Sequence, residues 1–307
     1  MSSANLASVA TEPTKEERRP TLRRRHGHRK SAIATVFMLV FLCYFLVPLA
    51  WLVVSSTKTN GDLFSSFGFW FSGKFSFWDN VRAVFSYSNG VFWHWLANSA
   101  WYSLLSALGA ASLATAAGYG FAKFSFIGKT PMFVIILGAI AVPTTALAVP
   151  TYLLFSKIGI VNTPWAVILP SLVNPIGIYL MRAYAADSVP DSMLEAARVD
   201  GAGEIAIFFR IAFPMTVPGF ITVLLFSLVS TWNNYFLPLV MLSNPTLYPV
   251  TVGLAQVNAA ANNAGGGAHA LFPIVITGSL VSIIPLIIAF LFLQRFWQSG
   301  LSSGAVK

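Results

Sequence analysis

Long apolar runs dominate the hydrophobic pattern of this chain. Six of them contain no Asp, Glu, Lys or Arg, and they cover residues 31–54, 92–121, 131–155, 163–181, 211–241 and 271–294. At about 1.5 Å of rise per residue, about 20 such residues cross the roughly 30 Å hydrocarbon core of a bilayer. The pattern therefore predicts six transmembrane helices.

Prolines lie inside or near several of these runs, at Pro48, Pro143, Pro150, Pro170, Pro175, Pro238 and Pro285. In lipid-buried helices, neighbouring helices can satisfy the backbone groups that a proline frees. We therefore expect kinks at these positions rather than breaks.

The amino-acid composition also indicates a membrane protein. The 307 residues are 56% hydrophobic and 14% aromatic, and only 9% are charged. One soluble core cannot hide that much apolar surface, so lipid must be the solvent for much of the chain. We expect an all-α integral membrane protein whose membrane domain covers residues 31–307.

The distribution of Lys and Arg predicts the orientation, because cytoplasmic loops retain these residues. With the amino terminus inside, fifteen lie in cytoplasmic segments and four lie outside. Both termini are therefore predicted to be cytoplasmic, with the chain crossing the membrane several times.

Residues 1–30 form a basic tail that contributes to a net charge of +9. Such a tail could bind nucleic acid or anionic lipid. A disordered topology anchor beside the first span is the interpretation we favour, with membrane lipid rather than nucleic acid as the partner.

Residues for catalysis or energy conversion are missing from the sequence. Cys43 is the single cysteine, and the four histidines have no metal-binding spacing. The Gly-Lys-Thr at residues 128–130 has Lys123 where a P-loop needs its first glycine, and the Gly68 segment has Phe75 where it needs a hydroxyl. The predicted spans also lack the carboxylates of a proton relay, although neutral oxygens could still hold sodium. We expect no catalytic residues, metal site or cofactor in this chain, and work supplied by a partner.

Acidic residues gather in one predicted cytoplasmic loop, at about residues 187–211. A helix of about eleven residues is expected there, with Pro190 in its first turn and Gly201 after its last. Met193, Leu194 and Ala197 would form its apolar face; Asp191, Glu195 and Arg198 would form the opposite face, with Glu195 and Arg198 paired. By pattern alone, a solvated loop helix without further function explains the cluster equally well.

The residues themselves carry a resemblance. The segment EAARVDGAGEIAIFFRIAFP, residues 195–214, resembles the EAA loop of permease subunits of binding-protein-dependent ABC importers. The matching positions are Glu195, Ala196, Ala197, Gly201, Ile211 and Pro214, and the departure is Phe213 where the family usually has Leu. Further segments, among them WNNYFLPL at residues 232–239 and the ending GLSSGAVK, resemble the carbohydrate-uptake branch and the smaller permease subunit of the maltose transporter.

This resemblance implies a type I importer permease bundle of six helices in a bacterial inner membrane, with a cytoplasmic coupling helix. It implies four kinds of partner: a second related permease, two ATPase subunits that hold ATP and magnesium, an extracytoplasmic solute-binding protein, and a sugar as substrate. The ATPase-coupling residues would be Glu195, Ala196, Ala197, Arg198, Asp200 and Gly201.

A sugar pathway should offer neutral hydrogen-bonding groups and aromatic surfaces. The candidates are Trp232, Asn233, Asn234 and Tyr235 in the fifth span, with Asn98 and Asn174 as weaker ones. Polar residues in spans also commonly make interhelical hydrogen bonds, which is the competing interpretation. For the whole protein, the competing hypothesis is a self-sufficient carrier or channel driven by a gradient.

Overall fold

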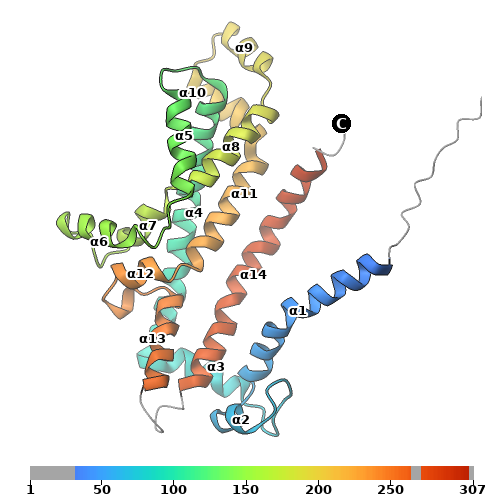
Figure 1. Ribbon diagram of the computed structural model, residues 1–307, viewed down its shortest axis with the longest axis vertical. Helices are drawn as coiled ribbons and strands as arrows, with labels where there is room; N and C mark the ends of the chain where they lie inside the picture. The colour runs from blue at the N-terminus through green and yellow to red at the C-terminus, as the bar shows by residue number, and fades with distance from the viewer. Residues whose placement is uncertain (1–31, 264–270, 304–307) are drawn as a thin grey trace, which may run out of the picture. The chain divides into compact units, whose positions relative to one another are not determined.

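The computed structural model describes residues 32–263 and 271–303, with side chains up to residue 294. Every element within these ranges is helical (Figure 1). The chain divides after Val47 into two compact units. The basic tail, residues 1–30, lies outside the described residues.

The described part of the first unit is the start of α1 (Ala32–Ser56), which continues into the second unit from Pro48. This helix of 25 residues contains no charged side chain. Its length and apolar composition match the first predicted span.

The second unit is built around α4 (Val91–Lys123), a helix of 33 residues. Two further helices, α8 (Pro175–Ser188) and α11 (Phe213–Trp232), pack along it and against each other. Small residues of α4 meet Met181 of α8 and Val223 of α11 in a buried cluster. Small residues let membrane helices approach closely, because dispersion contacts rather than burial from water hold them together.

The remaining helices complete the second unit: α2 (Asn60–Ser65), α3 (Phe77–Ser86), η1 (Tyr87–Gly90), α5 (Lys129–Ile140), α6 (Ala148–Lys157), α7 (Trp165–Ser171), α9 (Asp191–Val199), α10 (Glu204–Ile207), η2 (Phe208–Ala212), α12 (Phe236–Met241), η3 (Pro245–Leu247), α13 (Val250–Asn263) and α14 (Phe272–Ser303). Helix α14 packs on α11, α13 and α3.

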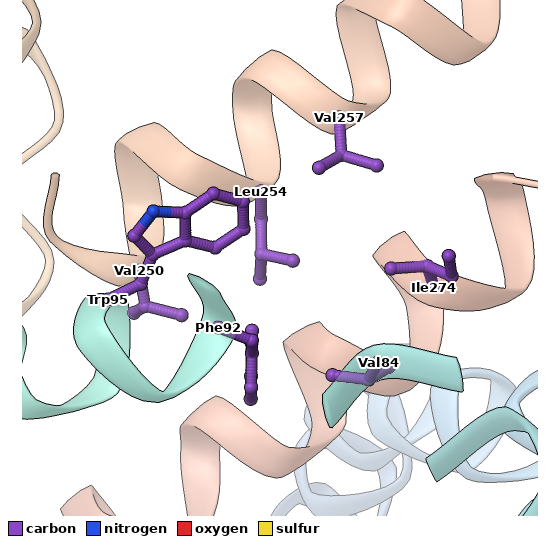
Figure 2. Packing of buried hydrophobic residues seen from close by; sticks show 7 residues of the cluster. All are labelled: Val84, Phe92, Trp95, Val250, Leu254, Val257 and Ile274. Atoms are coloured by element: carbon purple, nitrogen blue, oxygen red, sulfur yellow. The ribbon is translucent and has the colours of Figure 1, made fainter. Parts of the chain in front are cut away.

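At the amino-terminal end of α4, one apolar cluster joins α3, α4, α13 and α14 (Figure 2). Its members are Val84, Phe92, Trp95, Val250, Leu254, Val257 and Ile274. Gly253 lies directly against Trp95, where an added Cβ would come within 2.2 Å of the indole ring. Trp95 also donates a hydrogen bond to the carbonyl of Pro245, at 2.9 Å. This end of the bundle is therefore closely packed.

The expected count of six long spans is not confirmed. Within the described ranges, five stretches, each of one helix or of two or three consecutive helices, are long and apolar enough to cross a membrane, and α5 is a shorter apolar helix. The predicted span at 131–155 is divided, since α5 ends at Ile140 and α6 begins at Ala148. Two further predicted spans are divided at residues 172–174 and 233–235.

The expectation of kinks was therefore wrong at Pro143, which lies in the break between α5 and α6, and at Pro175, which begins α8 after the break that follows α7. A proline cannot donate the backbone hydrogen bond that continues a helix, and it disfavours helical angles in the residue before it. Asn174 accordingly has φ −130° and ψ 85°, and its side chain accepts a hydrogen bond from the backbone nitrogen of Gly177 as the cap of α8.

Candidate functional site

Helix α9 lies with α10 at one end of the second unit, beside the carboxyl-terminal end of α8 (Figure 1). It has nine residues rather than about eleven, because it begins at Asp191 and ends at Val199. Pro190 lies outside the first turn as the N-cap, with ψ at 134°. The existence of a short helix in this loop is thus confirmed, and it is shorter than expected by one residue at each end.

The carboxyl end of α9 is a Schellman motif. Gly201 has φ +81°, and its nitrogen donates to the carbonyl of Arg198 at 3.0 Å. The nitrogen of Ala202 donates to the carbonyl of Ala197, also at 3.0 Å. These two bonds satisfy carbonyls that the last turn leaves open, and they need a residue that adopts positive φ. Gly201 therefore ends the helix, as expected.

Leu194 and Ala197 form the base of α9, with 2% and 8% of their surfaces exposed. They share a cluster with residues of four other elements: Tyr119, Ala185, Val189, Ile207 and Ala212. Met193, expected on the same face, is 46% exposed. It lies at the edge of the stripe that Leu194 and Ala197 define, since side chains one residue apart point about 100° from each other.

Two ion pairs tie α9 to its neighbours. Lys123 at the end of α4 lies 2.8 Å from Asp191. Arg198 donates to both carboxylate oxygens of Glu204, at 2.6 and 3.2 Å, which raises the pKa of its guanidinium. The ion pair of Arg198 is therefore with Glu204 rather than with the expected Glu195, because the turn at Gly201 brings Glu204 back to Arg198. Glu195 still attracts the guanidinium, but at a distance longer than an ion pair.

Glu195 is consequently left exposed, with no hydrogen bond or ion pair to any described residue. Ala196 and Asp200 are exposed beside it. This surface of α9 (Glu195, Ala196, Arg198 and Asp200), which we term the α9 outer face, is small, charged and solvated.

The connection from α10 to α11 is a π-helical turn, η2. Such turns insert an extra residue into a helix and are frequent at functional sites. The ring of Phe208 in this turn lies 5.2 Å from that of Tyr119 in α4. One apolar cluster thus joins α9 to α4, α8 and the start of α11.

A cavity of about 260 Å³ lies at the other end of α11 and also borders α13 and α14. Three of the six pathway candidates line it: Trp232, Asn233 and Tyr235. We term it the α11–α14 cavity. None of its lining residues is charged.

Three hydroxyl residues that sequence reasoning missed complete its polar lining: Thr251, Ser279 and Ser282. The spacing of Ser279 and Ser282 by three residues inside an apolar run was a usable signal, since it puts both on one helix face. Their hydroxyls donate to backbone carbonyls of their own helix, and Thr251 donates to the carbonyl of Asn234 at 2.9 Å. Each oxygen therefore retains capacity to accept a hydrogen bond from a bound hydroxyl.

The other three candidates make structural hydrogen bonds. Asn98 donates to the carbonyls of Thr246 and Tyr248, at 2.8 and 3.1 Å. Asn174 donates to Ser227 at 2.9 Å, and the side chain of Asn234 accepts from the nitrogen of Leu237. Interhelical and capping bonds account for these amides, and none of the three lines the α11–α14 cavity.

What the cavity offers is therefore hydrogen bonding and aromatic contact. In the described ranges, no three His, Cys, Asp or Glu side chains gather as a metal site would require.

Several known proteins are similar to this chain in sequence, and one is similar in fold. The chain is 30% identical over 277 residues to "Arabinooligosaccharides transport system permease protein AraQ" of Bacillus subtilis, covering 90% of this chain and 95% of that protein. It is 33% identical over 229 residues to the AraQ protein of Halalkalibacterium halodurans, covering 75% and 79% of the two chains. It is 28% identical to "Melibiose/raffinose/stachyose import permease protein MelC" of Bacillus subtilis, covering 90% and 96%.

A chain in the crystal structure of a bacterial ABC transporter involved in alginate import superposes with a TM-score of 0.74. The two chains are 23% identical over 86% of this chain and 95% of that one, which shows a shared fold. Residues 110–301 match the family described as "Binding-protein-dependent transport system inner membrane component". The chain therefore belongs to this family of inner-membrane transport subunits, which are permeases rather than enzymes.

Proposed function

We propose that this protein is a permease subunit of an ATP-driven sugar importer. It forms the translocation pathway with a second, related permease, while two cytoplasmic ATPase subunits supply the work and an extracytoplasmic binding protein delivers the sugar. Support comes from relatives named for transport of arabinooligosaccharides, of melibiose, raffinose and stachyose, and of lactose.

The geometry of α9 carries this proposal. Its base is buried against α4, α8, α10 and η2, while its outer face lies exposed, with Glu195 making no hydrogen bond or salt bridge to any described residue. A helix that is fixed on one side and free on the other is suited to docking in a groove of an ATPase subunit. Closure of the ATPases would then move α4, α8 and α11 together.

The coupling role is tested with Glu195→Ala in the complete complex, reconstituted in proteoliposomes. If Glu195 makes a charged hydrogen bond to an ATPase subunit, its loss should lower substrate-stimulated ATP hydrolysis and uptake by about tenfold. Asp187→Asn is the matched control, because Asp187 is also exposed but precedes the EAA segment. Unchanged hydrolysis and uptake in Glu195→Ala would refute the assignment.

Proteoliposomes that contain this chain alone distinguish the proposed importer from a gradient-driven carrier. The importer needs its ATPase subunits, so this chain alone should not transport sugar under a proton or sodium gradient. Sugar uptake by the isolated chain would favour the carrier instead.

The substrate we infer is a neutral sugar. Indole and phenol rings pack on the apolar faces of sugar rings, and neutral amides and hydroxyls exchange hydrogen bonds with sugar hydroxyls. Trp232 and Tyr235 supply the rings of the α11–α14 cavity, and Asn233, Thr251 and Ser282 supply polar groups. A lining without Lys or Arg offers nothing to pair with the carboxylate of an acidic sugar.

Uptake competition tests this inference in a strain that carries the protein and in one that lacks it. Neutral mono- and oligosaccharides should compete for uptake, whereas uronate-containing ones should not. Asn233→Leu should weaken uptake by about tenfold, since a hydrogen-bonded sugar hydroxyl would lose its partner. Asn258→Leu, at an exposed position of α13 outside the cavity lining, should not. Equal effects of the two substitutions would remove Asn233 from the pathway.

A further inference from the structure

A second cavity, of about 330 Å³, lies between the end of α4, the start of α5 and the middle of α8. We term it the α4–α5–α8 cavity. Lys129 and Arg182 line it together with Tyr179 and the buried Phe121, and no acidic residue does. It therefore differs in charge from the α11–α14 cavity, whose lining is neutral.

Neither cation has an acidic partner among the described residues. Lys129 donates one hydrogen bond, to the carbonyl of Phe124 at 2.8 Å. The guanidinium carbon of Arg182 lies 4.1 Å from the centroid of the Phe133 ring, and its N–H groups make no hydrogen bond to any described residue. Nearby Lys123 and Arg198, by contrast, are both paired with carboxylates.

Two half-buried cations of one sign in a shared cavity repel each other, and each is partly removed from water. An anion between them would relieve both costs. The five N–H donors of Arg182 suit a tetrahedral anion with several oxygens, and the ammonium of Lys129 and the hydroxyl of Tyr179 add further donors.

We propose that the α4–α5–α8 cavity binds a phosphate group, with Arg182 and Lys129 as its principal contacts. The phosphate could belong to the headgroup of an anionic phospholipid or to a soluble phosphate ester. The neighbouring surface favours the lipid, because Ile127 is fully exposed and Met132 and Ile135 are 50% and 71% exposed. Acyl chains would cover this apolar surface while the headgroup enters the cavity. The proposal holds whatever solute the protein transports.

Thermal unfolding of the full-length protein in a neutral detergent tests the proposal. The probes are phosphatidylglycerol, phosphatidylcholine and glycerol 3-phosphate, titrated into wild type and into Lys129→Gln/Arg182→Gln. Phosphatidylglycerol should raise the unfolding temperature of wild type, with phosphatidylcholine much weaker. The double variant should bind phosphatidylglycerol at least about tenfold more weakly, since two charge-assisted contacts are removed.

The control Arg82→Gln/Lys157→Gln removes the same net charge from α3 and α6, which do not line the cavity. Lys129→Gln alone keeps the contact of Arg182 with Phe133, so weaker binding in this variant cannot be attributed to loss of that packing. Stabilisation by glycerol 3-phosphate that the double variant loses would support the phosphate site with a soluble source. Equal binding of phosphatidylglycerol by wild type and double variant, or no response of wild type to either phosphate compound, would overturn the proposal.

Discussion

Position 201 requires glycine because of its backbone angle φ, and not because a side chain would lack space. An added Cβ there would meet nothing within 4 Å, yet φ is +81°. For a residue with a side chain, this left-handed conformation costs about 1–2 kcal/mol. The end of α9, and with it the position of the α9 outer face, depends on this one residue.

Gly201→Ala should therefore destabilise the turn by about 1–2 kcal/mol without creating a clash. In the reconstituted complex we expect lower coupling of ATP hydrolysis to uptake, because the last turn of α9 would be less well fixed. Gly203→Ala is the control, since Gly203 has φ −73° and equally open surroundings. If both variants behave alike in coupled hydrolysis, the positive φ is not what matters.

The sequence predicted which residues of this loop stand out, but not all of their contacts. Gly201 as a helix end follows from local chemistry, and so does burial of Leu194 and Ala197. The choice of Glu204 over Glu195 as the partner of Arg198 depends on the direction in which the chain leaves Gly201. That direction is set by packing of Ile207 and Ala212 on α4 and α8, which a local pattern does not contain.

Close contact between α4 and α8 depends on a glycine. A Cβ at Gly118 would come within 2.6 Å of the Cβ of Met181 and 2.7 Å of the backbone nitrogen of Arg182. Backbone atoms cannot move aside without shifting the helix. Gly120, two residues further along α4, has nothing within 4 Å of an added Cβ.

Gly118→Ala should therefore separate α4 from α8 and destabilise the protein by about 1–3 kcal/mol, the usual cost of overpacking. Gly120→Ala should be neutral or stabilising by up to about 1 kcal/mol, because Ala is the better helix former. Denaturation of the purified protein in detergent measures both. A stable Gly118→Ala protein would mean that the two helices cross less closely.

Helix existence was easier to predict than helix continuity. The runs for α1, α4 and α14 were placed within about two residues of their amino-terminal ends. The break at 233–235 was not foreseen, since an all-round apolar run gives no periodicity to show where a helix stops. The break at 141–147 had a local signal in Pro143, which was interpreted as a kink. At residue 174 a signal was present, because Asn before Pro is typical of a turn or cap.

Across the whole molecule, α11 joins the two sites. Its amino-terminal end follows α9, α10 and η2, and its last residue, Trp232, lines the α11–α14 cavity. A helix of 20 residues is about 30 Å long. Under the proposed function, a displacement received at α9 is thus carried along one rigid element to the cavity. Three of the six pathway candidates predicted from the sequence line this cavity. Thr251, Ser279 and Ser282 reach it only through the packing of α13 and α14, which a local sequence pattern does not contain.

Orientation in the membrane is the last prediction, and it follows from charge. The end of the second unit that holds α9 carries Lys123, Lys129, Arg182, Arg198 and Arg210. Cytoplasmic loops retain such residues, so this end should face the cytoplasm.

With Cys43→Ser as the background, Ser65→Cys and Ser125→Cys report on two exposed positions, one after α1 and one between α4 and α5. In intact spheroplasts a membrane-impermeant maleimide should label the Ser65→Cys protein and spare the Ser125→Cys protein, which should react only after lysis. The reverse labelling would place α9 outside, away from ATP, and both the orientation and the coupling role would then be wrong.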